Sequence, residues 1–299
     1  RRPPRSTLSS SSAASDVYKR QSLNLVVNAM YRITLEGTDL AGNTGKKFVM
    51  SVVYDDIPPD LELAYPVNNS AVNHLDISYS ISEQLNVGKI VYTMIGGDED
   101  PNSPVSINLE ASELETSFDQ PQKTAQVPML NDGTIYNIQL FGEDLATNNA
   151  KSNVIENVKY DITRPRISIY YPTSNSYFMG SDINIDISED LKDGKMVWTR
   201  TGGLSDEVTK QKIPLYDQYL KKGAYEKASL PIEESLSAGV VYSLGVDAVD
   251  FAENEAEPVL IENIEFIRDM AGKWYYKGAI IEVVWVFEPD ETGISGRFL

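Results

Sequence analysis

Three blocks of this chain repeat one another at a nearly constant spacing. Residues 31–43, 136–148 and 242–254 each begin with tyrosine and end in the pattern Asp-x-Ala-x-Asn, and their tyrosines lie 105 and 106 residues apart. Residues 88–89 and 194–195 both read Gly-Lys and keep the offset of 106. Matching landmarks at one spacing predict a tandem array of units of about 105 residues, because each repeat then folds as one structural unit.

Within each unit the sequence pattern is that of β-strands. Residues 75–81 and 183–187 alternate apolar and polar side chains with a period of two, as strands with one buried face require. Glycine, proline, asparagine and aspartate interrupt the pattern at the spacing of short strands. About seven strands per unit predict an all-β fold of tandem seven-stranded β-sandwiches. Residues 214–227 are the exception, since their apolar side chains indicate a short helical insertion.

Proline marks the junctions between units. Pro58, Pro59 and Pro165 lie there, and proline stiffens a linker and donates no hydrogen bond to a strand ladder. We therefore expect residues 22–56 to be the C-terminal part of one repeat. Residues 57–161 and residues 162–268 follow as two complete repeats.

The repeated pattern resembles that of bacterial extracellular Ig-like repeats, which are related in shape to fibronectin type III modules. The pattern is a tyrosine, alternating apolar residues, Asp-x-Ala-x-Asn, and then Tyr-Asp ahead of proline. In such sandwiches a tyrosine near the start of a late strand turns its hydroxyl back onto the backbone, forming a tyrosine corner. The resemblance implies this structural role for Tyr31, Tyr136 and Tyr242.

Composition excludes several classes of function. The chain has no cysteine, so it has no disulfide framework, no thiolate nucleophile and no cysteine-ligated metal. His74 is its single histidine. With 26 Lys+Arg against 44 Asp+Glu, the net charge is −18, which disfavours nucleic acid and anionic membrane surfaces as partners. No pair of carboxylates stands out as catalytic, and we expect no enzymatic activity.

Calcium is the one cofactor that the residues suggest, because Ca²⁺ binds carboxylate, amide and carbonyl oxygens. The repeated loops offer three Asp–Asn pairs, and acidic residues of the junctions add further oxygens. Closure of Asx turns on the local backbone explains the same loops without any ion, and both interpretations remain open. The candidate ligands are Asp39, Asn43, Asp55, Asp56, Asp60, Asp144, Asn148, Asp161, Asp250 and Asn254.

Two functional interpretations follow. The first is a non-enzymatic structural or adhesive repeat array in a secreted or cell-surface bacterial protein, monomeric and rod-like, with surface glycans or proteins as partners. The second is an accessory carbohydrate- or ligand-binding region of a larger secreted enzyme. Neither predicts a segment that inserts into a membrane.

The two ends of the sequence differ from the repeats. Residues 1–21 are similar to a translated sequencing adapter, so we expect them to be disordered and the natural signal peptide to be missing. Gly272 and Trp274 resemble the Gly-x-Trp opening of a lipocalin-like barrel, which would make residues 269–299 the start of a truncated domain. A last β-hairpin packed on the preceding repeat is the alternative.

Overall fold

The computed structural model describes residues 23–268, apart from 116 and 206–207, together with 274–276 and 279–281. The chain divides into two compact units, residues 1–57 and residues 58–299. In the first unit, β1 (Met30–Thr38) and β2 (Thr44–Val53) pair as an antiparallel hairpin. Their turn is the first Asp-x-Ala-x-Asn block, so the repeated block is a hairpin loop.

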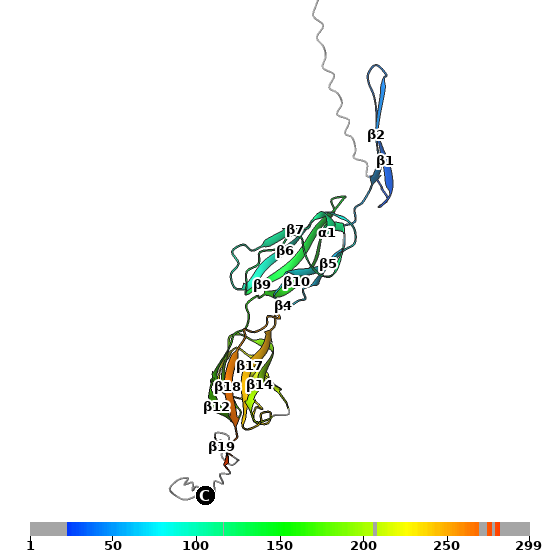
Figure 1. Ribbon diagram of the computed structural model, residues 1–299. Helices are drawn as coiled ribbons and strands as arrows, with labels where there is room; N and C mark the ends of the chain where they lie inside the picture. Colours follow the sequence, from blue (N-terminus) through cyan, green and yellow to red (C-terminus); the bar gives the residue numbers. More distant parts are fainter. Residues whose placement is uncertain (1–22, 116, 206–207, 269–273, 277–278, 282–299) are drawn as a thin grey trace, which may run out of the picture. The chain divides into compact units, whose positions relative to one another are not determined.

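The second unit begins with a sandwich of two sheets (Figure 1). A three-stranded sheet has the order β3-β5-β8, and a five-stranded sheet has the order β4-β10-β9-β6-β7. The strands are β3 (Leu61–Tyr65), β4 (Ala71–Val72), β5 (Asp76–Ile81), β6 (Leu85–Gly97), β7 (Val105–Asn108), β8 (Phe118–Lys123), β9 (Thr134–Asp144) and β10 (Asn149–Tyr160).

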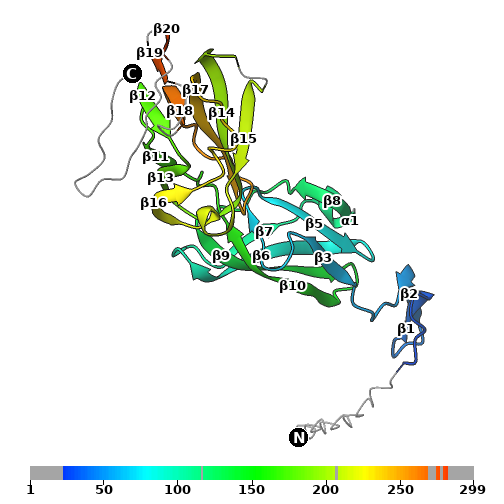
Figure 2. The same cartoon turned by 90° about the horizontal axis from the view of Figure 1, so that it is seen from below.

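A second sandwich follows with the same strand order. Its sheets are β11-β13-β16 and β12-β18-β17-β14-β15, and Figure 2 shows the five strands of the larger sheet in that sequence. The strands are β11 (Ile167–Tyr171), β12 (Ser176–Met179), β13 (Asp182–Ile187), β14 (Leu191–Gly203), β15 (Lys210–Pro214), β16 (Gly223–Ser229), β17 (Val240–Asp250) and β18 (Leu260–Ile267). The constant offset in the sequence thus corresponds to a repeated topology.

Counted with a divided first strand, each sandwich has the expected seven strands. The first strand of each is divided: β3 pairs with β5 in one sheet, whereas β4 pairs in parallel with β10 in the other. Pro66 follows β3, and Pro172 follows the equivalent β11. Because proline has no backbone N–H, the ladder is interrupted there and the chain crosses between sheets.

The two cores are separate and are built by the predicted alternation. Along β9, buried and half-buried residues alternate without exception. The first core contains Tyr92 and the second contains Trp198 at the same register position, 4% and 0% exposed. Each packs edge-on against the tyrosine that begins the repeated block, with ring centroids 6.5 and 6.1 Å apart.

Helical structure is slight in the described residues. It comprises α1 (Ala111–Glu115) and a 3-10 turn, η1 (Asp217–Leu220). The expected helical insertion is therefore one turn, and it leads directly into β16.

Neither end tests its sequence-based prediction in full. At the C-terminal side, β19 (Trp274–Tyr276) pairs with β20 (Ala279–Ile281). Nothing in this short pairing supports a lipocalin-like barrel, and the remainder of that segment lies outside the described residues. The adapter-like residues 1–21 lie outside them as well.

Candidate functional site

The repeated Asp-x-Ala-x-Asn loops close on themselves in the same way three times. In the last loop, Oδ1 of Asp250 accepts hydrogen bonds from the backbone N–H groups of Ala252 and Asn254, both at 2.8 Å. Its Oδ2 accepts one from Nδ2 of Asn254, also at 2.8 Å. The loops at Asp144 and Asp39 repeat these three bonds. The aspartate is thus the acceptor that holds each hairpin turn.

Hydrogen bonding also shifts the acidity of two of these aspartates. Burial alone would raise the pKa of Asp144, but the hydrogen bonds from the Asn148 side chain and from backbone N–H groups outweigh it and lower the pKa. At Asp39 the side chain of Asn43 is the largest cause, and it likewise lowers the pKa. Both loops therefore hold an ionised carboxylate at neutral pH.

The fourth residue of each loop adopts a left-handed backbone. The φ angle is +89° at Gly42, +72° at Thr147 and +69° at Glu253. Glycine takes this conformation without strain, whereas a side chain, and a β-branched one above all, does not. The two sandwiches thus carry a strained residue where the hairpin of the first unit has glycine.

The last loop also binds the segment between the sandwiches. Asn254 is 8% exposed, and its Nδ2 donates to the carbonyl oxygen of Asp161 at 2.8 Å. Its Oδ1 accepts a hydrogen bond from Nδ2 of Asn73, in the first sandwich, at 3.1 Å. Arg164 adds two hydrogen bonds to the carbonyl oxygens of Glu255 and Ala256.

At this junction three carboxylates meet. Oxygen atoms of Asp161, Glu189 and Asp250 lie within 4.8 Å of one another. Asp161 also accepts a hydrogen bond from Nζ of Lys159 at 2.6 Å. Burial, and then the charges of Asp161 and Asp250, raise the pKa of Glu189. The cluster thus brings three carboxylates together, and Lys159 neutralises only part of their negative charge.

Sequence reasoning named Asp161 and Asp250 but missed Glu189. A signal was present, because Ser82-Glu83 and Ser188-Glu189 lie 106 residues apart. Of the other predicted ligands, those of the first two loops make the turn-closing hydrogen bonds described above. Asp55 and Asp56 belong to the first unit. Asp55 accepts a hydrogen bond from the backbone N–H of Ile57, and Asp56 accepts one from the hydroxyl of Tyr54. Asp60 is exposed beside Ser82, whose Oγ accepts its backbone N–H.

The three tyrosines share one geometry. The hydroxyl of Tyr136 accepts a hydrogen bond from the backbone N–H of Asn131, five residues upstream, at 2.9 Å. Tyr242 and Tyr31 do the same with the N–H groups of Ser237 and Val26. Each hydroxyl therefore serves as an acceptor for a backbone donor.

The first sandwich adds a contact at this position. The hydroxyl of Tyr136 donates to Oδ2 of Asp100 at 2.7 Å, and Asp100 is 4% exposed. Burial raises the pKa of Tyr136, and the bond to Asp100 adds to the rise.

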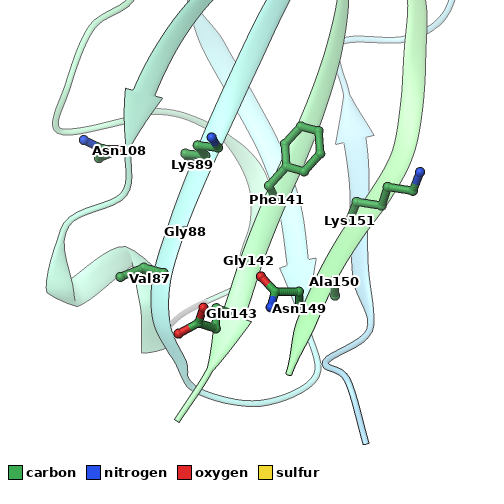
Figure 3. A pocket seen from close by; sticks show the side chains of 10 residues that line it. All are labelled: Val87, Gly88, Lys89, Asn108, Phe141, Gly142, Glu143, Asn149, Ala150 and Lys151. Carbon is green, nitrogen blue, oxygen red and sulfur yellow. The ribbon is translucent and has the colours of Figure 1, made fainter. Parts of the chain in front are cut away.

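A cleft of about 610 Å³ opens on the first sandwich, and sequence reasoning did not anticipate it. Figure 3 shows it on the outer face of β6, β9 and β10. Phe141 lies at its centre, with Lys89 and Lys151 as its direct neighbours on the two adjacent strands. Nζ of Lys89 lies 5.8 Å from the centre of the Phe141 ring. Such cross-strand neighbours are set by register and leave no simple trace in the sequence.

No helix in the described part of the chain is both long and apolar enough to cross a membrane.

Comparison with known proteins finds likeness among solved structures, at low identity and low TM-scores. No protein-family model matches the chain, and no curated protein matches it. Among solved structures, it is similar to fibronectin(III)-like modules of CbhA from Clostridium thermocellum, with 15% identity over 72% of this chain and 98% of that one, at a TM-score of 0.31. Titin domains A168–A170 share 9% identity over 79% of this chain and 75% of theirs, at 0.32. A tetra-tandem repeat from the extending region of a large adhesion protein shares 13% over 80% and 57%, at 0.28. The sheet order of the two sandwiches, and not these likenesses, gives the fold, which is that of tandem Ig-like and fibronectin III-like β-sandwiches.

Proposed function

We propose that this chain is a non-enzymatic repeat region of a secreted or cell-surface bacterial protein, in which tandem sandwiches serve as a structural spacer or adhesive array. The repetition carries the proposal: two sandwiches of one strand order, each with its own core, follow one another in the second unit. The repeated Asp-x-Ala-x-Asn loops also have a structural role in closing hairpin turns. The carboxylates of Asp144 and Asp250 accept hydrogen bonds from local backbone N–H groups.

Contacts at the junction support a load-bearing role. Asn254 links its own loop, the backbone of Asp161 and the side chain of Asn73 through three hydrogen bonds. A connection of this kind limits bending between consecutive sandwiches, because bending breaks several partly buried hydrogen bonds at once. A spacer needs this property and requires no pocket.

Force-extension of the full chain tests the spacer role. We expect two separate unfolding events, each releasing roughly 300 Å of chain, as about 105 residues extend. Extension without discrete events, or one event for both sandwiches, contradicts independent load-bearing modules. Antibody labelling of intact cells tests the location, and labelling only after permeabilisation contradicts it.

We also propose that the junction cluster binds Ca²⁺. What supports this is the approach of the carboxylates of Asp161, Glu189 and Asp250, because Ca²⁺ binds several oxygens in a flexible arrangement. Burial, and then the charges of Asp161 and Asp250, raise the pKa of Glu189, and an ion there would offset the repulsion between these carboxylates. The bonds that close the loop at Asp250 occupy both lone pairs of Oδ1 but leave one on Oδ2, so turn closure and ion binding are compatible.

Thermal melts of the full chain test calcium in three conditions: millimolar CaCl₂, NaCl at matched ionic strength, and chelator. Binding stabilises by mass action, by about 2.7 kcal/mol at a hundredfold excess over the dissociation constant. We expect a calcium-specific rise that Glu189→Gln abolishes and that the exposed control Glu234→Gln retains. Equal melting temperatures in CaCl₂ and NaCl would contradict a specific calcium site, because general screening of the negative charges would then account for any rise over the chelator sample.

The alternative is an accessory, carbohydrate-binding region of a larger secreted enzyme. The observation that favours it is the cleft at Phe141, because a spacer has no need of one.

A further inference from the structure

The cleft on the first sandwich is built from two rows of side chains that cross the strands. Strand pairing places Asn108, Lys89, Phe141 and Lys151 side by side on β7, β6, β9 and β10. The next outward-facing row contains Val87, Glu143 and Asn149. Figure 3 shows both rows, with the backbone of the two paired glycines between them.

Glycine is required at the floor of the cleft. A Cβ on Gly142 would lie 2.8 Å from Cδ1 of Leu85, and one on Gly88 would lie 2.9 Å from Cδ1 of Leu109. Both contacts are on the core side of the sheet. These two positions face the core, so the floor between the two outward-facing rows is backbone.

The charge of the first row is opposite to that of the chain. Lys89 and Lys151 are exposed, and among the described residues neither makes an ion pair. Adjacent strands are about 4.8 Å apart, so the two lysines stand roughly 10 Å apart across the ring of Phe141. In a chain of net charge −18, two unpaired ammonium groups on one face make a local site for an anion.

The equivalent face of the second sandwich carries different side chains. Asp247 stands at the register position of Phe141, paired with Lys195 as Phe141 is paired with Lys89. Lys195 binds Asp193 at 2.7 Å, and Lys212 binds Asp247 at 3.1 Å. Ion pairs within the sheet satisfy these lysines, and the aromatic ring is absent.

The ring and the second row indicate a polar ligand with an apolar face. Figure 3 shows the half-buried ring of Phe141 face-on between the two lysines. An aromatic face is electron-rich and attracts the C–H groups on the face of a sugar ring. Glu143 and Asn149 offer hydrogen-bond partners for hydroxyl groups, and Glu143 repels a carboxylate from that row.

We propose that this cleft binds a uronic-acid-containing polysaccharide. One sugar ring stacks on Phe141, and its carboxylate or those of its neighbours lie against Lys89 and Lys151. The hydroxyl groups face Glu143 and Asn149. The proposal goes beyond the spacer role, which requires no ligand, so either can fail while the other holds.

Calorimetric titration of the full chain at low salt tests the proposal with two probes, a hexamer of galacturonic acid and neutral maltohexaose. We expect the uronate hexamer to bind and the neutral hexamer to bind at least about tenfold more weakly, because the neutral sugar forms no charge pair with the two lysines. Phe141→Ala should weaken uronate binding about tenfold. Lys89→Gln and Lys151→Gln should each weaken it several-fold, and 0.5 M NaCl should do the same.

The matched control is the double variant Lys195→Gln, Lys212→Gln on the equivalent face of the second sandwich. It should bind like the original chain. Absence of uronate binding, equal affinity for maltohexaose, or an equal loss in the control each overturns the proposal. As a second measurement, amide shifts on adding the uronate hexamer should cluster on β6, β9 and β10, and shifts spread over both sandwiches contradict the site.

Discussion

The two complete sandwiches share a strand order and differ in what their larger sheets present outward. The first has unpaired lysines on both sides of Phe141, whereas the second has Asp247 in place of Phe141 and holds Lys195 and Lys212 in ion pairs with aspartates. Their cores, in contrast, are alike at the tyrosine that begins the block and at the aromatic residue that packs on it. The comparison teaches that the inward half of each strand preserves the fold, while the outward half is free to vary.

The largest expected effect tests whether the two cores are independent. Trp198→Ala should lower the free energy of unfolding of the second sandwich by about 3–5 kcal/mol, because a fully buried aromatic side chain leaves a cavity. The first sandwich should be unaffected, since Trp198 packs within the second core. Hydrogen exchange resolved by segment measures both. Loss of protection in the first sandwich would mean that the two unfold together.

Next comes the tyrosine that begins the block. Tyr136→Phe should destabilise the first sandwich by about 1–3 kcal/mol, because a backbone N–H loses its acceptor and the buried Asp100 loses a donor. Denaturant melts give the value, with the exposed Tyr177→Phe as the control. A change no larger than that of the control would show that the hydroxyl contributes little.

A smaller effect concerns the strained loop position. Thr147→Gly should stabilise the first sandwich by about 0.5–1 kcal/mol, since glycine adopts a positive φ without a side-chain clash. Glu253→Gly in the second sandwich should gain less, because Glu253 also pairs with Lys192. Melting temperatures of the two variants test the order. A loss of stability in Thr147→Gly contradicts the strain argument.

The smallest effect is a pH dependence at the junction. Because the pKa of Glu189 is raised in the fold, the folded chain holds that proton more tightly than the unfolded chain does. Its stabilising contribution is present below the usual pKa of 4.5 and is lost as pH rises through the raised value. Without calcium, Glu189→Gln should therefore stabilise the protein at pH 7 by about 0.5 kcal/mol, a scale set by partly exposed charges.

The control for this prediction is Glu234→Gln, and the measurement is a series of melts from pH 4 to pH 8 in chelator. The gain from Glu189→Gln should shrink toward pH 4. A gain that is constant over this range would assign it to something other than ionisation.

Much of this protein was predictable from its sequence alone. The alternation along β9, the repeat offset and the turn-forming Asp-x-Ala-x-Asn blocks are local properties, because side-chain period and turn chemistry depend on neighbours in the chain. They determined the all-β class, the two sandwiches and the position of the tyrosines.

Only the tertiary structure decided which residues meet. Glu189 joins Asp161 and Asp250 because β13 ends where the junction and the β17 loop come together. Lys89, Phe141 and Lys151 share a row because three strands pair in one register. The first strand divides at Pro66 because its two segments pair with strands of different sheets, β5 for one and β10 for the other. Cross-strand contact is set by pairing over long separations, so a one-residue change of register would have placed different side chains on each face.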